Sequence, residues 1–163
     1  MNENEIVKDP VCHMEVPAAS FAIEYMGINY AFCSAQCQER FLANPHLYVG
    51  MPGQKAPKQE GLEVIKQRRI RLAQPLSAEQ TATLINILQA MMGIKSVTAE
   101  GENITIVYDL LQATAEQIET RLPEIGVQLG EGWTERLRRA FVHYEEECEV
   151  GSLEVQPPRH LHG

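Results

Sequence analysis

The residues best suited to chemistry are three cysteines near the start of the chain, Cys12, Cys33 and Cys37; a fourth, Cys148, lies near its end. Twenty residues separate Cys12 from Cys33, and three separate Cys33 from Cys37. In a reducing compartment, clustered cysteines are thiolate ligands or redox groups more often than disulfide partners. A redox pair usually has the spacing Cys-x-x-Cys, which is not found here. We predict that the three residues bind a soft metal ion. The alternative is three buried structural cysteines.

The sequence between these cysteines predicts the elements that hold them. Apolar side chains alternate with polar or small ones over residues 21–25 and 28–32, on either side of a turn at Met26–Gly27. This is the pattern of a β-hairpin. Ser34 is suited to cap a short helix, and Asn44–Pro45 would end it.

These elements would bring the three sulfurs to one point. Cys12 precedes the hairpin, Cys33 ends its second strand, and Cys37 falls in the first turn of the helix. Unpaired N–H groups at the helix N-terminus should favour the thiolate of Cys37. A domain of about 50 residues has too small a core to be very stable alone, so a metal would also stabilise it. We expect the three sulfurs to converge and Cys148 not to join them.

The same region resembles the YHS domain, a member of the TRASH group of cysteine-containing metal-binding modules. Three segments carry the resemblance: DPVCHMEV at 9–16, the pattern YxGxxYxFCSxxC at 25–37, and FLANPHLY at 41–48. It covers about residues 7–50. It implies that Cys12, Cys33 and Cys37 are metal ligands. The family occurs beside heavy-metal P-type ATPases and in metal-handling and metal-sensing proteins.

The sequence departs from the family pattern at His13, where a glycine commonly follows the first cysteine. His13 is either a fourth metal ligand or an exposed loop residue, and His46 is a weaker ligand candidate. Three thiolates suit copper(I) and can also hold Hg(II) or Cd(II), whereas adding His13 would give the Cys3His set of a zinc site. We therefore expect the bound ion to be copper(I) or zinc.

The rest of the chain has a different pattern. Residues 1–50 are followed by a Gly- and Pro-rich linker at 51–61 and a second domain at 62–130. In that domain, strand and helix patterns alternate in the order β-α-β-β-α-β, with capping boxes that begin at Ser77 and Thr114. The expected elements are strands at 63–72, 94–99, 103–108 and 127–129, and helices that begin after Ser77 and Thr114.

The order is that of a ferredoxin-like fold. It resembles the heavy-metal-associated domain, but the loop at 73–80 lacks that family's Cys-x-x-Cys, so no metal site is carried over. The predicted fold class is α+β: a small hairpin-plus-helix metal-binding domain, then a ferredoxin-like βαββαβ domain with a C-terminal helix.

That helix, at residues 131–150, is amphipathic, and a flexible tail at 151–163 follows it. Its apolar residues recur at helical spacing and form a stripe: Trp133, Leu137, Ala140, Phe141, Tyr144 and Cys148. We expect the stripe to be buried against the sheet or against a second copy of the chain, with Cys148 packed inside it. The tail histidines His160 and His162 could bind metal loosely.

The whole sequence narrows the function further. A net charge of −8 argues against nucleic-acid binding. No apolar run is long enough for membrane insertion, and no signal segment is present, so the expected location is cytoplasmic. No nucleophile–base set or phosphate loop suggests an enzyme. The chain reads as an intracellular heavy-metal-binding protein: a metallochaperone, a buffer or an accessory to metal export, with a heavy-metal P-type ATPase as a candidate partner. The alternatives are an adaptor with a structural zinc site and a metal sensor that acts through a protein partner.

Overall fold

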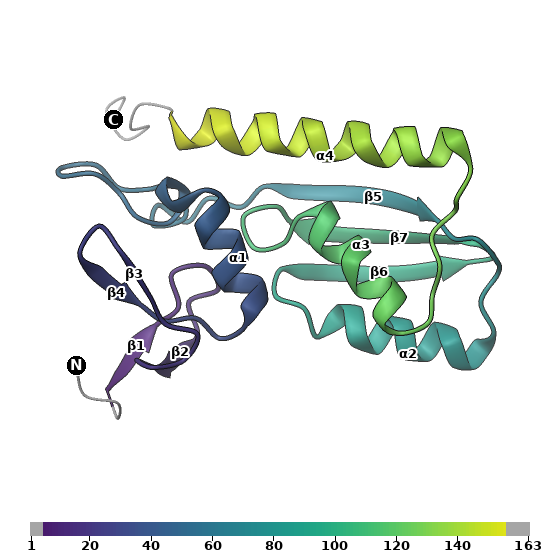
Figure 1. Ribbon diagram of the computed structural model, residues 1–163, viewed down its shortest axis with the longest axis horizontal. Helices are drawn as coiled ribbons and strands as arrows, with labels where there is room; N and C mark the ends of the chain where they lie inside the picture. The colour runs from purple at the N-terminus through teal and green to yellow at the C-terminus, as the bar shows by residue number, and fades with distance from the viewer. Residues whose placement is uncertain (1–4, 156–163) are drawn as a thin grey trace. The chain divides into compact units, whose positions relative to one another are not determined.

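The structure, a computed structural model, describes residues 5–155, which separate into two compact units. Within this range the first unit comprises residues 5–63 and 149–155, and the second comprises residues 64–148. The fold mixes small hairpins, helices and a three-stranded sheet (Figure 1). No helix among residues 5–155 is long and apolar enough to cross a membrane.

The first unit begins with two antiparallel hairpins. Strands β1 (Ile6–Lys8) and β2 (Glu15–Pro17) pair around a loop, and β3 (Ile23–Tyr25) pairs with β4 (Ile28–Tyr30). Both residues of the second turn are left-handed, with φ of 51° at Met26 and 78° at Gly27. This is the twist that two-residue hairpins prefer. The predicted hairpin is therefore confirmed, and the β1–β2 hairpin is a second one that the sequence did not predict.

Helix α1 (Ala35–Ala43) follows, capped by the Ser34 hydroxyl and ended at Asn44, before a short 3-10 turn, η1 (Pro45–Leu47). The predicted helix and both of its ends are confirmed. Phe41 is fully buried, and four aromatic rings lie around it with centroids 5.1–6.0 Å away: Tyr25, Tyr30, Phe32 and Tyr48. This aromatic cluster fixes α1 against the β3–β4 hairpin.

Residues 51–61, expected as a linker, form turns within the first unit. Ala56 and Lys58 are buried, and the Lys58 N–H donates to the carbonyl of Leu47 over 2.9 Å. These turns add to the small core that the hairpins and α1 share.

The second unit contains an antiparallel sheet in the order β5-β7-β6; in the sequence, helix α2 lies between β5 and β6, and helix α3 follows β7 (Figure 1). The bounds are β5 (Ile65–Arg71), α2 (Ala78–Gln89), β6 (Ile94–Glu100), β7 (Asn103–Asp109) and α3 (Ala115–Glu124). Both predicted capping boxes are present, at Ser77–Gln80 and Thr114–Gln117.

The predicted fourth strand at 127–129 is wrong. Its place is taken by a single bridge between Leu72 and Leu129 at the free edge of β5. Two backbone hydrogen bonds of 2.9 Å flank this bridge, from the N–H of Ala73 to the carbonyl of Gln128 and from the N–H of Gly130 to the carbonyl of Arg71, and the pairing does not extend into a longer strand. The complete βαββαβ arrangement is therefore not confirmed.

Helix α4 (Trp133–Glu154) ends the described chain and extends beyond the predicted boundary at 150. Its orientation corrects two predictions. The apolar stripe is exposed, with Trp133 at 79% and Phe141 at 61% exposure, and Cys148 is exposed with it. Burial of the stripe in the monomer and a packed Cys148 are both wrong, because the opposite face of α4 makes the contacts with the second unit. His160 and His162 lie outside the described residues.

Candidate metal centre

The candidate site is built around Asp9, a carboxylate that sequence reasoning did not single out. Asp9 lies at the start of the β1–β2 loop and is completely buried. Its Oδ1 accepts from the N–H groups of Val11 at 2.7 Å and Cys12 at 3.2 Å, and its Oδ2 accepts from the N–H of Cys33 at 2.8 Å. One side chain thus ties the loop that carries Cys12 to the segment that carries Cys33.

Asp9 also closes its own loop. Its N–H donates to the carbonyl of Met14 at 2.8 Å, and its carbonyl accepts from the N–H of His13 at 2.9 Å. An aspartate that hydrogen-bonds backbone groups two or three residues ahead is a known turn former. That preference was the available signal: Asp9-Pro10 begins the DPVC segment.

The structure brings the three predicted sulfurs together. The Sγ of Cys33 lies 3.5 Å from that of Cys12 and 3.5 Å from that of Cys37. Cys37 occupies the first turn of α1, where its N–H donates to the capping Ser34 hydroxyl. All three cysteines are free thiols, since a disulfide would need about 2.05 Å. Asp9 completes a group in which one ligand atom per residue lies within 4.8 Å of the others.

The charge in this cluster lies elsewhere than the sequence suggested. A hydrogen bond from Cys37 lowers the pKa of the Cys12 thiol. The same hydrogen bond, together with burial, raises the pKa of Cys37. Burial raises the pKa of Cys33 to about 11. Of the three thiols, Cys12 is therefore the one whose pKa is lowered, whereas Cys37, at the helix N-terminus, has its pKa raised.

The two candidate histidines lie outside this group of ligand atoms, which among residues 5–155 contains no imidazole. His13 is largely exposed, and the partial desolvation of its ring, together with the charges of Lys58 and Lys8, lowers its pKa. Its φ of 67° is left-handed, which explains on steric grounds why glycine suits this position. The ring Nε2 of His46 instead lies 3.1 Å from the hydroxyl of Tyr25, and the backbone N–H of His46 donates to the carboxylate of Glu154 at 2.9 Å.

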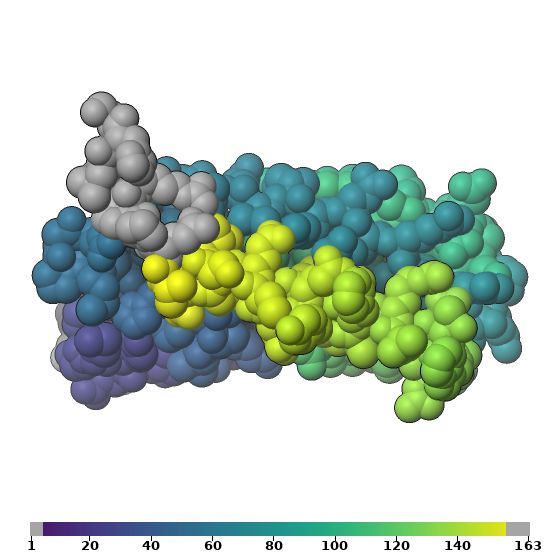
Figure 2. Space-filling model, turned by 90° about the horizontal axis from the view of Figure 1, so that it is seen from above, coloured from purple at the N-terminus to yellow at the C-terminus, as the bar shows by residue number. Residues whose placement is uncertain are grey.

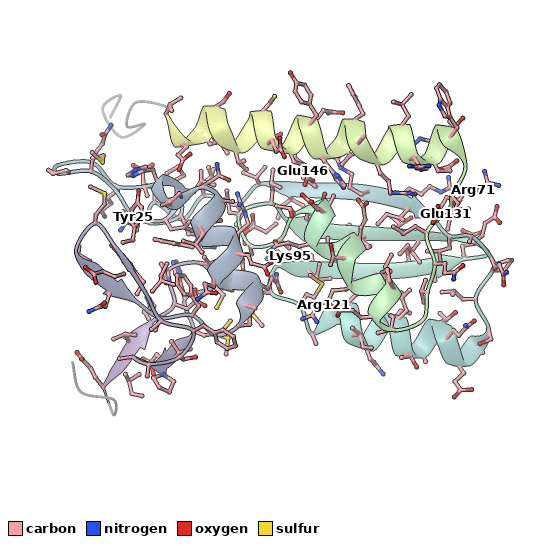
Figure 3. The ribbon with its side chains drawn as sticks, in the orientation of Figure 1. Tyr25, Arg71, Lys95, Arg121, Glu131 and Glu146 are labelled. Carbon is pink, nitrogen blue, oxygen red and sulfur yellow. The ribbon has the colours of Figure 1, made fainter. Side chains whose placement is uncertain are left out.

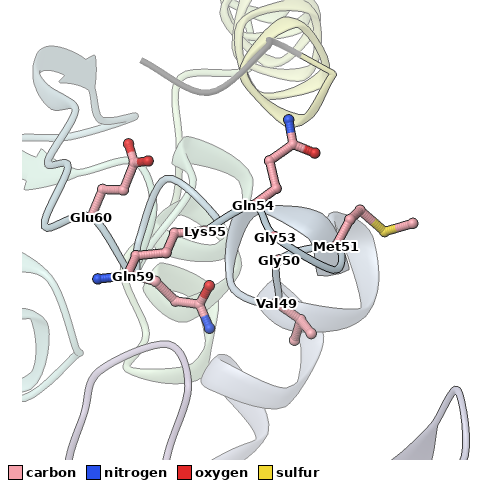
Figure 4. Close-up of a pocket in the computed structure, with 8 residues that line it drawn as sticks. All are labelled: Val49, Gly50, Met51, Gly53, Gln54, Lys55, Gln59 and Glu60. Carbon is pink, nitrogen blue, oxygen red and sulfur yellow. The ribbon is translucent and has the colours of Figure 1, made fainter. Parts of the chain in front are cut away.

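A pocket elsewhere on the first unit lacks the donors for such a site. It is lined by residues of the 49–60 segment (Figure 4). The described residues that line it offer one thioether, Met51, and neither a thiol nor an imidazole. The thiols of the first unit thus gather at the Asp9 loop.

The donor set fits a metal ion. Sulfurs bound to one ion at about 2.3 Å lie within about 4 Å of each other, and the two sulfur–sulfur distances of 3.5 Å are close to that value. Cys12, Cys33 and Cys37 would hold the ion. The fold and the site thus define a small module with a Cys/Asp cluster that is able to bind a metal ion.

Comparison with known families names this module. Residues 7–51 match the family model of the YHS domain, so the chain contains a YHS domain, as the sequence motifs predicted. The match takes in both hairpins from Val7 onward, α1 and η1. Comparisons with curated proteins and with solved structures give no match. The predicted resemblance of the second unit to heavy-metal-associated domains is therefore not confirmed.

Proposed function

We propose that the protein binds a soft heavy-metal ion through Cys12, Cys33 and Cys37, and that copper(I) is the preferred ion. The observation that carries the proposal is the pair of 3.5 Å sulfur contacts at the Asp9 loop. Soft thiolates favour copper(I), which accepts three ligands, whereas structural zinc takes four. Here the carboxylate oxygens of Asp9 already accept three backbone N–H groups, and His13 is exposed.

The role that fits such a site is a metallochaperone, a buffer or an accessory to metal export, rather than an enzyme. The partly exposed Cys12 and Cys33 support exchange of the ion with a partner, since a fully closed site would hold it. Free thiols persist in a reducing compartment such as the cytoplasm. The YHS resemblance is the ground for proposing a heavy-metal P-type ATPase as the partner.

The test is a titration of reduced, full-length protein with copper(I) and with zinc, each against a chromophoric chelator. We expect one copper(I) ion per chain, bound more tightly than zinc. Replacing Cys12, Cys33 or Cys37 by Ser should weaken binding by at least about 100-fold, on the scale of losing a ligand. The matched control is Cys148→Ser, which should leave the affinity unchanged. Unchanged binding in Cys33→Ser would overturn the proposal.

The second candidate is an adaptor with a structural zinc site. Asp9 favours it, because its carboxylate lies within 4.8 Å of the sulfurs and could supply a fourth ligand. The two candidates differ in exchange rate. A structural zinc ion would leave slowly when a chelator is added, and the domain would unfold as it left. Rapid transfer of copper(I) to the chelator, with the fold retained, would favour the first candidate.

A further inference from the structure

Residues 133–148 of helix α4 belong to the second unit. An ordinary surface helix buries its apolar face, whereas this part of α4 exposes it. Its apolar residues point outward: Trp133 is 79% exposed, Leu137 57%, Phe141 61% and Tyr144 64%. Cys148 continues the same line and is exposed as well. This part of α4 is uncovered on the face seen in Figure 2. We call these five residues the α4 stripe.

The inward face of α4 is polar and is held by specific contacts. Glu146 is 3% exposed; it accepts from the N–H of Ala115 at 2.8 Å and from the hydroxyl of Tyr108. It points from α4 toward the sheet (Figure 3). One helical turn earlier, His143 Nε2 lies 2.9 Å from the carboxylate of Glu119, which Arg139 also approaches at 3.6 Å. Rolling the helix to bury the stripe would break these contacts, so the stripe must be covered from outside.

The spacing of the stripe is that of a helix-pairing seam. Leu137, Phe141, Tyr144 and Cys148 follow one another at intervals of four, three and four residues. This is the heptad repeat by which two helices interlock side chains. Trp133 lies four residues before Leu137, at a position that flanks the N-terminal end of the seam. The occupant that matches this spacing is another helix.

The charges beside the seam specify which helix. The first half of α4 carries the exposed Arg136 and Arg138, and the second half carries the exposed Glu145 and Glu147. This order opposes the helix dipole, which favours acidic residues at the N-terminus and basic residues at the C-terminus. An antiparallel second α4 would compensate, because it sets the acidic half of one helix beside the basic half of the other. In heptad terms the exposed Arg138 and Glu145 both flank the seam at e positions, which face each other in an antiparallel pair.

We propose that the α4 stripe is a dimer interface through which two copies of this chain pair, with their α4 helices antiparallel. Each aromatic side chain can bury roughly 150–250 Å². Three aromatic residues supply roughly 450–750 Å², less than the roughly 800 Å² per partner of a standard interface. The dimer is accordingly concentration-dependent and forms in the micromolar range.

Sedimentation velocity on the full chain tests this, with reductant present and protein from about 1 to about 200 μM. The wild type should shift from monomer to dimer across this range. Phe141→Glu, which puts a charge into the seam, should raise the dissociation constant at least tenfold. The matched control, Gln89→Ala, changes an exposed residue of α2, outside α4, and should leave the constant unchanged. A wild type that stays monomeric throughout, because something else covers the stripe, would overturn the proposal, as would a Phe141→Glu variant that still dimerises.

Two further variants test the orientation. Arg138→Glu and Glu145→Arg should each weaken the dimer, and the double variant should restore it, because the pair is re-formed with its signs exchanged. In the antiparallel register Leu137 faces Cys148 of the other copy, while the two Cys148 residues lie roughly 16 Å apart along the axis. Mild oxidation of Leu137→Cys should therefore link position 137 to Cys148, as identified by mass spectrometry of the peptides. A Cys148–Cys148 link, or a double variant weaker than both single variants, would refute the antiparallel pairing.

Discussion

Asp9 shows how one buried carboxylate can position the cysteines of a site through hydrogen bonds to backbone N–H groups. Its two oxygens accept hydrogen bonds from the backbone N–H groups of Cys12, of Cys33 and of Val11, the residue before Cys12. Charge-assisted bonds of this kind are shorter and stronger than neutral ones. The hydrogen bonds therefore set the positions of two sulfurs that are distant in sequence. Asp9 also adds negative charge beside the cluster, which favours a bound cation.

This role predicts a large effect for a change of one atom. Asp9→Asn keeps the shape but replaces an acceptor by a donor that faces backbone N–H groups. We expect a loss of about 1–3 kcal/mol of stability in the first unit and a fall of about 10–100-fold in metal affinity. Chemical denaturation and chelator competition would measure the two effects. The exposed Glu15→Gln in the same hairpin is the control. Unchanged affinity in Asp9→Asn would show that Asp9 does not position the site.

His13 can be tested by separating its backbone from its ring. Its left-handed φ of 67° is costly for a residue with a Cβ. We expect His13→Gly to raise stability by up to about 1 kcal/mol relative to His13→Ala, which keeps the strain. Metal affinity should change little in either variant, because the ring lies outside the cluster. A large and equal loss of affinity in both would establish the imidazole as a ligand.

The protonation of the cluster predicts a pH dependence of metal binding. The pKa of Cys33 is raised to about 11 by burial, and that of Cys37 is raised by its hydrogen bond to Cys12 and by burial. Both thiols therefore hold protons at neutral pH, and a metal that binds both sulfurs must release those protons. Affinity should fall as pH falls, by about 100-fold per pH unit for two released protons. Competition titrations at several pH values would measure the slope; a flat profile would contradict the assignment.

At the scale of elements, local signals in the sequence were reliable where they were strong. The capping boxes at Ser77 and Thr114 and the Met26–Gly27 turn identified two helices and a hairpin, because each depends on neighbouring residues alone. The three-residue strands β1 and β2 carry no such pattern, since their pairing depends on the Asp9 loop between them.

The orientation of α4 could not be predicted from its periodicity. The repeat shows that one face is apolar, but the partner of each face depends on residues distant in sequence. Here the second unit offers Tyr108, Glu119 and the N–H of Ala115 to the polar face of α4. Burying charged groups is favourable only when their partners are in place. The periodicity of a helix does not identify those partners. The prediction that Cys148 is buried was wrong for the same reason.

The polar contacts of α4 predict a pH effect on the second unit. Burial raises the pKa of Glu119, although His143 and Arg139 beside it act in the opposite direction. A carboxyl whose pKa is higher in the folded state stabilises the fold below its unfolded pKa, and this contribution is lost as pH rises through the folded value. Glu119→Gln cannot ionise, so its melting temperature should rise relative to wild type between about pH 4 and pH 7.

Thermal unfolding of both proteins across this range would measure that difference. Glu116→Gln, an exposed carboxyl on the same helix, is the control and should show little change. If the difference in melting temperature between Glu119→Gln and wild type does not change with pH, Glu119 has the same pKa in the folded and unfolded chains.

At the scale of the whole molecule, the first unit is assembled from two segments that are far apart in the sequence. The YHS match ends at residue 51, but the unit also includes residues 149–155 at the end of the described chain. Val150 and Leu153 are buried, and Glu154 accepts from the N–H of His46 at 2.9 Å and from the amide of Asn44 at 3.3 Å. The end of α4 thus belongs to the same unit as the candidate metal site, which a family match to residues 7–51 could not indicate.

This assembly predicts that a residue more than 100 positions from the cysteines controls the order of their domain. Leu153→Ala should destabilise the first unit by about 2–3 kcal/mol, at the lower end of the range for buried leucines. In the metal-free protein, amide exchange should show lost protection over residues 6–48. Protection over residues 65–124 should be unchanged, because the second unit has its own core. Bound metal should restore part of the loss, since the ion binds only the folded site.

The control is Val155→Ala, two residues further on and 82% exposed, which should exchange like the wild type. Metal removal alone gives the second comparison: stripping the ion from the wild type should loosen residues 6–48 less than stripping it from Leu153→Ala, because Leu153 still supports the core. If Leu153→Ala leaves residues 6–48 as protected as in the wild type, the C-terminal segment is not part of the metal-binding unit. If residues 65–124 lose protection equally, the two units do not unfold separately.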